Sequence, residues 1–440
     1  MKIQKELWKN DKKDEVFMDN KKNLEKLNSQ FFLVLENKNA TDEIKLKKIK
    51  YLARLGGDVD CVDEKGNPLL KVAIKNCGKE IAEWLLDNGA NKNRKDKNLR
   101  TPLMIAARYG KPEIVELLCK RGVRREKTDF VGETALMGVV VKNDEKSVKI
   151  LLENGASPDT RAEGSLRTAL MIATDLGRHN IMKILLENDA EVNWDDCCDT
   201  NALMLGVKNK DVEAVKILLE NGAMVNLGDD REESALYKAV MEGDEEIFQL
   251  LYDRGGNIEK QNVDGDTLLM GAYRVGDEWM VAKLESLGAN REARNYMDED
   301  ILIMAIKGGN VSLIKKAIKN GAKVNRVYGV SCSTPLMCAC ASGKVELVKA
   351  LVEEGAKLET KVGKTESSVF EVLISENNTF NKYGEVVKYL LSKGCKVKEG
   401  ALSKARDMGY GEDVLKMINK AVEDRKNKSF LGRLKNYGRV

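Results

Sequence analysis

The chain has 440 residues, and its 74 lysines and arginines are nearly balanced by 70 aspartates and glutamates. This balance gives no bulk charge that would indicate nucleic acid as a partner. The sequence holds a single histidine. One histidine excludes a metal site built from several histidines and any pair of catalytic histidines.

Residues 1–23 are expected to form a charged lead-in that is partly helical or without fixed structure. The opening letters, MKIQKELWKNDKKDEVF, lack the apolar core of a signal peptide. The longest strongly apolar run, Phe31 to Leu35, is too short to cross a bilayer. We therefore expect a cytoplasmic protein with no transmembrane segment, and we leave open export without a signal peptide.

A two-helix unit stands out between Thr101 and Val123, which reads TPLMIAARYGKPEIVELLCKRGV. Thr101 can cap a helix with its hydroxyl, and Pro102 suits the first helical position because its missing N–H has no partner there. Gly110 is placed to end this helix, and the apolar spacing that follows indicates a second one, stopped by Gly122. The stretch therefore predicts an inner helix, an outer helix and two stops.

The same pattern returns at steps of 33 or 34 residues, and a fixed period of this length indicates a stacked-repeat protein. The T-P-L-x-x-A signature and the later G-A-x-V-N resemble the ankyrin repeat. The resemblance covers residues 24–422 and implies an all-α ankyrin-repeat solenoid of stacked helix-turn-helix units with projecting finger loops. Ten units are expected to begin near Pro68, Thr101, Thr134, Thr168, Asn201, Ser234, Thr267, Asp300, Thr334 and Ser368.

The end units depart from the pattern. Residues 24–67 are predicted to form a degenerate N-terminal cap unit, residues 68–400 the ten repeats, and residues 401–422 a C-terminal cap unit. Residues 375–385 lengthen the turn inside the last repeat. Residues 423–440 are predicted to form a basic tail whose role stays open.

The fourth position of the family's T-P-L-H signature is histidine, which joins a hydrogen-bond network between neighbouring fingers. In this chain the position is methionine, a flexible apolar side chain that can fill the space but is not expected to replace the network. The fingers are therefore expected to be tied less rigidly. The methionines are Met104, Met137, Met171, Met204, Met270 and Met337.

No residue pattern indicates catalysis or a cofactor. There is no G-x-x-x-x-G-K-[ST] phosphate loop and no G-x-S-x-G nucleophile elbow. The histidine, His179, falls at the start of an outer helix and is predicted to be exposed or capping. We expect no enzyme, no cofactor, no metal and no small-molecule substrate.

The cysteines are scattered without the spacing of a disulfide framework. Cys338 and Cys340 are two apart on a predicted helix and so point roughly 200° apart, which makes a metal site with Cys332 a poor fit. Cys197 and Cys198 are adjacent in a finger. They are the best candidate for a redox-sensitive position, and their role stays open.

The resemblance implies that partners bind the finger tips and the exposed side of the inner helices. Tyrosine, tryptophan, arginine and methionine are enriched at the centres of protein interfaces. For each residue, the alternative is that the side chain only shields its own finger. The candidates are Lys97, Arg100, Arg108, Tyr109, Phe130, Trp194, Arg231, Met241, Arg274, Tyr296 and Lys307.

These observations predict a non-enzymatic scaffold or adaptor, monomeric on its own, that binds an unknown partner protein through a concave face and the finger loops. The alternative is an effector or inhibitor of one cellular or host protein. A third hypothesis, a nucleic-acid or anionic-membrane binder that uses the basic tail, is less favoured. Binding at two salt concentrations distinguishes it, because phosphate contacts weaken steeply with salt.

Overall fold

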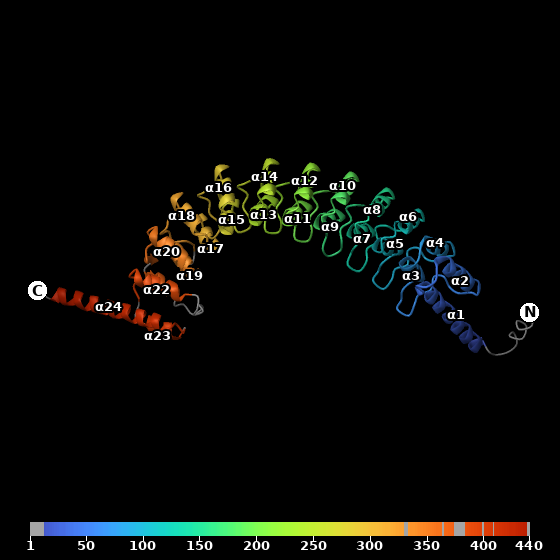
Figure 1. Cartoon of the computed structure of the whole chain (residues 1–440), viewed down its shortest axis with the longest axis horizontal. Coiled ribbons are helices and arrows are strands. Elements are labelled where there is room, and N and C mark those ends of the chain that lie inside the picture. The colour runs from blue at the N-terminus through green and yellow to red at the C-terminus, as the bar shows by residue number, and fades with distance from the viewer. Residues whose placement is uncertain are drawn as a thin grey trace, which may run out of the picture. The chain divides into compact units, whose positions relative to one another are not determined.

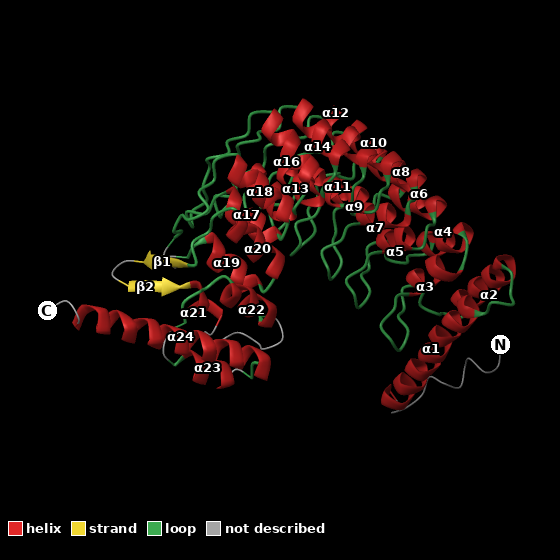
Figure 2. Cartoon of the chain, turned by 60° about the vertical axis from the view of Figure 1, so that its left-hand side comes forward, coloured by secondary structure: helices red, strands yellow, loops and turns green. Residues whose placement is uncertain are grey.

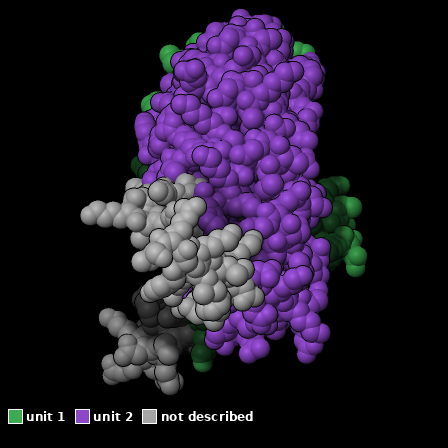
Figure 3. Space-filling model, turned by 90° about the vertical axis from the view of Figure 1, so that its left-hand side faces the viewer, with its two compact units in different colours: residues 1–224 green, residues 225–440 purple. Residues whose placement is uncertain are grey.

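The computed structural model describes residues 13–329, 333–362, 365–373, 383–397, 400–407 and 409–437. The chain divides into two compact units, residues 1–224 and 225–440, which are green and purple in Figure 3. Within each unit, short helices follow one another in pairs along the chain (Figure 1).

The first unit contains twelve helices in its described part. They are α1 (Lys13–Glu36), α2 (Asp42–Arg54), α3 (Leu69–Asn76), α4 (Lys79–Asp87), α5 (Pro102–Arg108), α6 (Pro112–Lys120), α7 (Ala135–Lys142), α8 (Glu145–Glu153), α9 (Ala169–Asp175), α10 (His179–Glu187), α11 (Ala202–Lys208) and α12 (Val212–Glu220). From α3 onward, odd-numbered helices are the inner ones and even-numbered helices the outer ones.

The second unit continues the alternation and adds a short hairpin. Its described elements are α13 (Ala235–Glu242), α14 (Glu245–Asp253), α15 (Leu268–Val275), α16 (Glu278–Ser286), α17 (Ile301–Gly308), α18 (Val311–Lys319), α19 (Pro335–Ser342), α20 (Val345–Glu353), β1 (Glu359–Val362), β2 (Thr365–Ser368), α21 (Val369–Leu373), α22 (Gly384–Ser392), α23 (Ala401–Asp407) and α24 (Glu412–Tyr437).

The caps that set the repeat are those expected from the sequence. The Thr101 hydroxyl accepts the N–H of Met104 at 3.3 Å, and Pro102 occupies the first helical position of α5. Gly110 then takes a left-handed conformation with φ 60°. In the repeat whose second glycine is missing, Asp189 adopts the same conformation with φ 61°, so the backbone turn is kept without the glycine.

The core is a layer of apolar side chains between successive helix pairs. Leu103, Ala106 and Ala107 of α5 are fully buried, and α5 packs against α6 and α7. The small alanines allow the neighbouring inner helix to come close. The structure is therefore the stacked all-α ankyrin solenoid that the sequence predicts.

The signature methionines are buried, and two of them do more than fill space. The Thr101 N–H lies 3.4 Å from the Met104 sulfur, and the Thr134 N–H lies 3.5 Å from the Met137 sulfur. Sulfur is a weak acceptor, so these two methionines partly satisfy the cap N–H groups. The buried set is Met104, Met137, Met171, Met204, Met270 and Met337.

Neighbouring fingers are tied by amide side chains rather than by histidine. In the first unit, the Asn193 side chain accepts the N–H of Met224 at 2.8 Å and donates to the Gly222 carbonyl at 3.3 Å. In the second unit, Asn226 accepts from Asn257 at 2.8 Å and donates to Gly255 at 2.9 Å. The fingers are thus linked although the histidine network is absent at the methionine positions.

Two helices run across the segment boundaries that the sequence analysis placed at residues 23–24 and 422–423. Helix α1 runs from Lys13 through residue 24, and α24 continues through residue 423 to Tyr437. Lysine and glutamate are good helix formers, so a charged segment need not end a helix. No helix among the described residues is long and apolar enough to span a bilayer.

The last repeat departs from the helical pattern. Strands β1 and β2 pair antiparallel, with Glu359 opposite Ser368 (yellow in Figure 2). This hairpin was not expected from the sequence. The long turn expected at residues 375–385 lies mostly outside the described residues. By contrast Asp300, which replaces the usual threonine, caps α17 by accepting the N–H groups of Leu302 and Ile303.

Candidate functional site

The fingers before α5 and α7 are built on two aspartates. One Asp96 carboxylate oxygen accepts the N–H groups of Asn98 and Arg100, both at 2.9 Å, and Asp129 holds the next finger in the same way. The Arg100 Nε lies 3.2 Å from Asp129, and the Phe130 N–H donates to the Asn98 carbonyl at 3.1 Å. The two fingers therefore form one connected edge.

The charge of Asp96 is part of this arrangement. Burial alone would raise the pKa of the Asp96 carboxyl group. The Lys71 ammonium at 2.6 Å and the N–H groups of Arg100 and Asn98 outweigh burial and hold the pKa below its ordinary value. The carboxylate is therefore ionised at neutral pH and keeps the finger in place.

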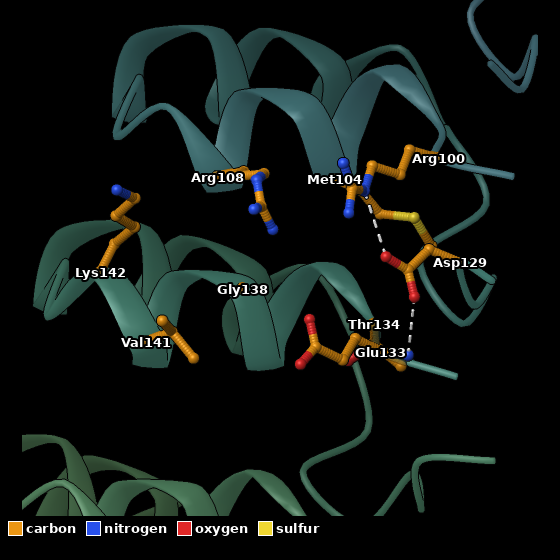
Figure 4. A pocket seen from close by; sticks show the side chains of 9 residues that line it. All are labelled: Arg100, Met104, Arg108, Asp129, Glu133, Thr134, Gly138, Val141 and Lys142. Carbon is orange, nitrogen blue, oxygen red and sulfur yellow. Dashed lines mark hydrogen bonds and ion pairs between the residues drawn. The ribbon is translucent and has the colours of Figure 1, made fainter. Parts of the chain in front are cut away.

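A cavity of about 210 Å³ opens between the inner helices α5 and α7 (Figure 4). Met104, Thr134 and Gly138 line its inner side, and Val141 lies at its edge with its side chain exposed. Arg108 projects from α5 toward the gap between the two helices. The cavity thus combines an apolar part, formed by Met104, Gly138 and Val141, with charged side chains around it, and it lies between the inner helices predicted to bind a partner.

Three charged side chains around the cavity have no partner within the part of the chain that the structure describes. They are Arg108, Lys142 and Glu133, none of which forms a side-chain hydrogen bond or ion pair there. Arg108 and Lys142 lie at the C-terminal ends of α5 and α7, whereas Glu133 precedes α7. These three charges therefore stand at opposite ends of the cavity, whereas Arg100 and Asp129, which also line it, are paired with each other at 3.2 Å.

The structure does not bring the remaining candidates of the first unit into this cavity. Tyr109 lies against Lys75, whose Nζ is 5.9 Å from the ring centre. The Trp194 ring covers the Arg161 guanidinium at 4.9 Å, and Arg161 also binds Asp195. Trp194 therefore shields an ion pair of its own fingers. Lys97 and Phe130 stay exposed at the finger edge, and Phe130 is 76% exposed.

In the second unit, two candidate cations on the inner helices are paired internally. Arg274 lies 3.2 Å from Asp266, and Lys307 lies 2.7 Å from Glu299. Met241 is half-buried, and its sulfur lies 3.9 Å from Arg274. These side chains already stabilise their own repeats.

The finger candidates of the second unit are also linked to each other. The Arg231 guanidinium lies 3.3 Å from the Asp264 carboxylate. The Tyr296 N–H donates to the Asp264 carbonyl at 3.0 Å, while the Tyr296 side chain is 77% exposed. Of these two, only the Tyr296 ring lacks a described partner and projects from its finger.

Four cavity residues were missed by the sequence reasoning: Asp129, Glu133, Gly138 and Lys142. A position-by-position comparison of the repeats could have found Gly138, because Ile105 and Ile172 occupy its place in the neighbouring units. The cavity itself depends on which side chains fill the space around this position.

The single histidine has a structural partner. His179 Nε2 lies 2.7 Å from Asp211, which also caps α12 by accepting the N–H of Ala214 at 3.0 Å. The side chain therefore links the N-terminal ends of two neighbouring outer helices, α10 and α12.

The two adjacent cysteines, Cys197 and Cys198, lie at a finger tip. The sulfurs of Cys197 and Cys198 are 3.9 Å apart and exposed, and the Asp196 carboxylate is near both. One Asp196 oxygen accepts the N–H of Cys198 as part of the finger turn. Burial raises the pKa of Cys340, whereas Cys332 lies outside the described residues.

A family model described as ankyrin repeats in three copies matches the chain over most of its length. The matched residues are 37–129, 89–162, 121–196, 203–295, 269–362 and 302–401. Together these ranges span residues 37–196 and 203–401, which is more than half of the chain.

Curated relatives match shorter stretches. A transient receptor potential cation channel subfamily A member 1 homolog of Caenorhabditis elegans is 31% identical over 137 residues, which is 31% of this chain and 11% of that protein. An ankyrin-repeat protein of Rickettsia bellii is 33% identical over 127 residues, or 27% and 35% of the two chains. A fowlpox virus ankyrin-repeat protein is 34% identical over 137 residues, or 30% and 39%. The match thus spans well under half of each relative.

Solved structures with similar folds include the ankyrin repeat domain of Bcl-3. It matches with a TM-score of 0.47 and 24% identity, over 50% of this chain and all of that domain. The human ASB11 ankyrin repeat domain matches with a TM-score of 0.41 and 26% identity, over 46% of this chain and 89% of that one.

Proposed function

Because the chain belongs to the ankyrin-repeat family, we propose that it is a non-enzymatic scaffold or adaptor that binds a partner protein. Ankyrin repeats are protein–protein interaction modules. Binding would use the finger edge before α5 and α7 and the exposed side of these two inner helices. A preformed surface loses little entropy on binding, so side-chain variety on a constant frame can set specificity.

The observation that carries the proposal is the exposure of large apolar side chains on two linked fingers. Phe130 is 76% exposed, Val131 47% and Leu99 49%. Leu99 also has a φ of 59°, where neighbouring fingers place Gly66 and Gly132. A leucine in this conformation is strained. Leu166, Asp199, Glu232 and Asp298 adopt the same conformation in other fingers, so the support for contact is the exposure of these apolar side chains rather than the strain.

The charge of these fingers supports an acidic partner surface. Residues 92–100 read KNRKDKNLR and residues 120–127 read KRGVRREK. Within the described residues, the side chains of Lys97, Arg124 and Lys127 have no hydrogen bond or ion pair. Such unpaired cations steer an acidic partner and select against a basic one.

A cytoplasmic location is part of the proposal. Burial, with a smaller contribution from Asp58, raises the pKa of Cys61 to about 12. Burial also raises the pKa of Cys77 and Cys119. No disulfide joins cysteines within the described residues, which suits a reducing compartment.

The proposal is tested by affinity capture from a cell extract with the full chain, followed by measured affinity for the purified partner. We expect Lys97→Glu combined with Phe130→Ala to weaken that affinity at least about tenfold. Lys149→Glu, a charge reversal at an exposed position of outer helix α8, is the matched control. Equal binding by the double variant and the control contradicts the proposed surface.

A nuclease-treated extract compared at two salt concentrations tests the nucleic-acid alternative. Retention of the partner after nuclease treatment, with a moderate salt dependence, is expected for a protein partner. Loss of all binding after nuclease treatment would instead favour the phosphate-binding hypothesis.

A further inference from the structure

Gly138 occupies a position where the neighbouring inner helices of the same unit carry large apolar residues, namely Ile105, Ile172 and Leu205. The glycine is in a regular helix and has no left-handed φ. A Cβ atom added there would meet only the Ala107 Cβ, at 3.6 Å, which is an ordinary contact. Since glycine inside a helix is destabilising relative to alanine, neither the backbone nor crowding accounts for it.

One turn further along α7, Val141 departs from its neighbours in a second way. The same repeat position is Arg108 in α5, Asp175 in α9 and Lys208 in α11. At position 141 a charged residue is replaced by an exposed apolar one. The two departures lie one helical turn apart on α7 and both line the cavity of about 210 Å³.

The charges around this cavity specify what it can hold. Arg108 and Lys142 lie at one end and Glu133 at the other, and none has a partner in the described part of the chain. Arg100 and Asp129 also line the cavity, but they bind each other at 3.2 Å. Figure 4 shows the Arg108 guanidinium projecting from α5 and the Glu133 carboxylate standing at the start of α7. An occupant should therefore supply a carboxylate, an apolar group and a hydrogen-bond donor.

We propose that this cavity is the docking pocket for an acidic–apolar residue pair in an extended segment of a partner protein. The apolar side chain lies over Gly138, and the neighbouring carboxylate binds Arg108 and Lys142. A backbone N–H of the segment donates to Glu133. The inference rests on the proposed protein-binding function and adds the chemistry of the bound segment.

The observations favour a peptide over the other anionic ligands. A nucleic-acid strand would gain nothing from Val141 or from the open space over Gly138, and its phosphates would be repelled by Glu133. A cavity of about 210 Å³ is also smaller than the roughly 300–1,000 Å³ typical of small-molecule and cofactor pockets.

The test uses the full chain and a library of random peptides displayed on phage. Selected peptides are synthesised with a fluorescent label and titrated against wild type, Arg108→Glu and Gly138→Ile. Gly138→Ile installs the residue found in the neighbouring helices. The control is Lys208→Glu, which changes an exposed lysine at the same repeat position in α11, outside the cavity. Thermal melts of all four proteins check that each remains folded.

We expect selected peptides to place an acidic residue beside an apolar one. Their affinity should fall at least about tenfold for Arg108→Glu and Gly138→Ile, and should be unchanged for Lys208→Glu. Selection repeated on Arg108→Glu should shift the preference toward basic residues. This shift requires direct contact and does not depend on Gly138→Ile folding well.

Three results overturn the pocket. The first is that the selected peptides bind all variants with equal affinity. Those peptides would then bind elsewhere on the protein, and the proposed protein-binding function would still stand. Another is the failure of any peptide to be selected, in which case capture of a folded partner still decides the proposed function separately. The third is a single-stranded oligonucleotide that binds wild type, is lost with Arg108→Glu and is unaffected by Gly138→Ile.

Discussion

Two pairs of neighbouring inner helices can be compared: α5 with α7 in the first unit, and α13 with α15 in the second. Each pair, called a wall below, has a glycine at the same repeat position, Gly138 in α7 and Gly271 in α15. In the second unit, a Cβ on Gly271 would meet the Met241 sulfur at 3.4 Å and the Tyr237 side chain at 3.5 Å. At Gly138 it would meet only Ala107. The same glycine is therefore covered in one wall and left open in the other.

The charges differ in the same way. Arg274 of α15 binds Asp266 at 3.2 Å and the Tyr237 hydroxyl at 3.1 Å, so the chain fills this wall with its own guanidinium. In α7 the corresponding residue is Val141, and Glu133, which corresponds to Asp266, has no cation among the described residues. A repeat position alone thus does not assign a binding role, because the neighbouring repeat decides whether the side chain is used internally.

The largest expected effect tests whether the signature methionines are core residues in both units. Met171→Ala in the first unit and Met270→Ala in the second should each lower the free energy of unfolding by about 2–5 kcal/mol, because both side chains are buried. Met297→Ala, at a side chain 67% exposed, is the control. Equal melting temperatures for all three variants would show that the methionines are not core residues.

The next test separates the two arginines. Arg274→Ala should destabilise the protein by about 1–3 kcal/mol, because the buried Asp266 and Tyr237 side chains both lose a partner. Arg108→Ala should change stability by no more than about 0.5 kcal/mol, since its guanidinium binds no described residue. Urea unfolding of both variants measures the difference. Similar losses in the two variants would remove the distinction between the walls.

The finger aspartates should behave alike in both units. Burial opposes ionisation of Asp96 and Asp229, but Lys71 and Lys238 respectively, with backbone N–H groups, hold each pKa below its ordinary value. A lowered folded-state pKa contributes stability above the unfolded value, near 4, which is lost as the pH falls through the folded value. Stability should therefore decrease below about pH 4.

The next finger has an asparagine at the position of Asp229, and this natural difference suggests the variant to test. Asn262 occupies the place of Asp229 in the next finger and accepts the same two backbone N–H bonds, at 3.0 and 2.9 Å. Asp229→Asn should keep the turn, cost about 1 kcal/mol at pH 7 and reduce the acid dependence. Urea unfolding at pH 7 and at acid pH measures both effects. An unchanged acid dependence in this variant and in Asp96→Asn would contradict the assignment.

The smallest expected effect comes from giving one wall a residue that the other wall has at the same repeat position. Val141→Arg gives α7 the residue that α15 has at this position, and should pair with Glu133. We expect a gain of up to about 1 kcal/mol in stability, measured by thermal melts, together with weaker peptide binding because the cavity is filled. A loss of stability, or peptide binding equal to wild type, would show that the two walls differ in more than this residue.

Signals that lie within one repeat were predictable from the sequence. Threonine at 101, asparagine at 201 and serine at 234 each cap an inner helix, as their short polar side chains indicate. The fold followed from these local signals and their period. The boundaries placed at residues 24 and 423 did not follow from them, because the composition shifts there while helices α1 and α24 continue.

Signals that depend on two repeats were not predictable in the same way. Arg108 and Arg274 were both selected for their position on an inner helix, yet only Arg274 meets an acid and a tyrosine hydroxyl. Trp194 was selected for its size, and its ring covers Arg161 of the preceding finger. The Tyr237 hydroxyl and Arg161 each lie about a full repeat away from the residue they contact, which the local pattern does not specify, whereas Asp266 is only eight residues before Arg274.

The amide links between fingers bear on how such a chain changes length in evolution. Asn93 accepts the N–H of Arg124, and Asn193 accepts that of Met224, each pair being 31 residues apart. Since the bond goes to a backbone N–H, the identity of the donor residue does not matter. Excision of residues 101–133 would present Asn93 with the N–H of Ser157, which now binds Glu126. Duplication or loss of 33 residues in phase with the repeat would therefore place a backbone N–H opposite this asparagine again.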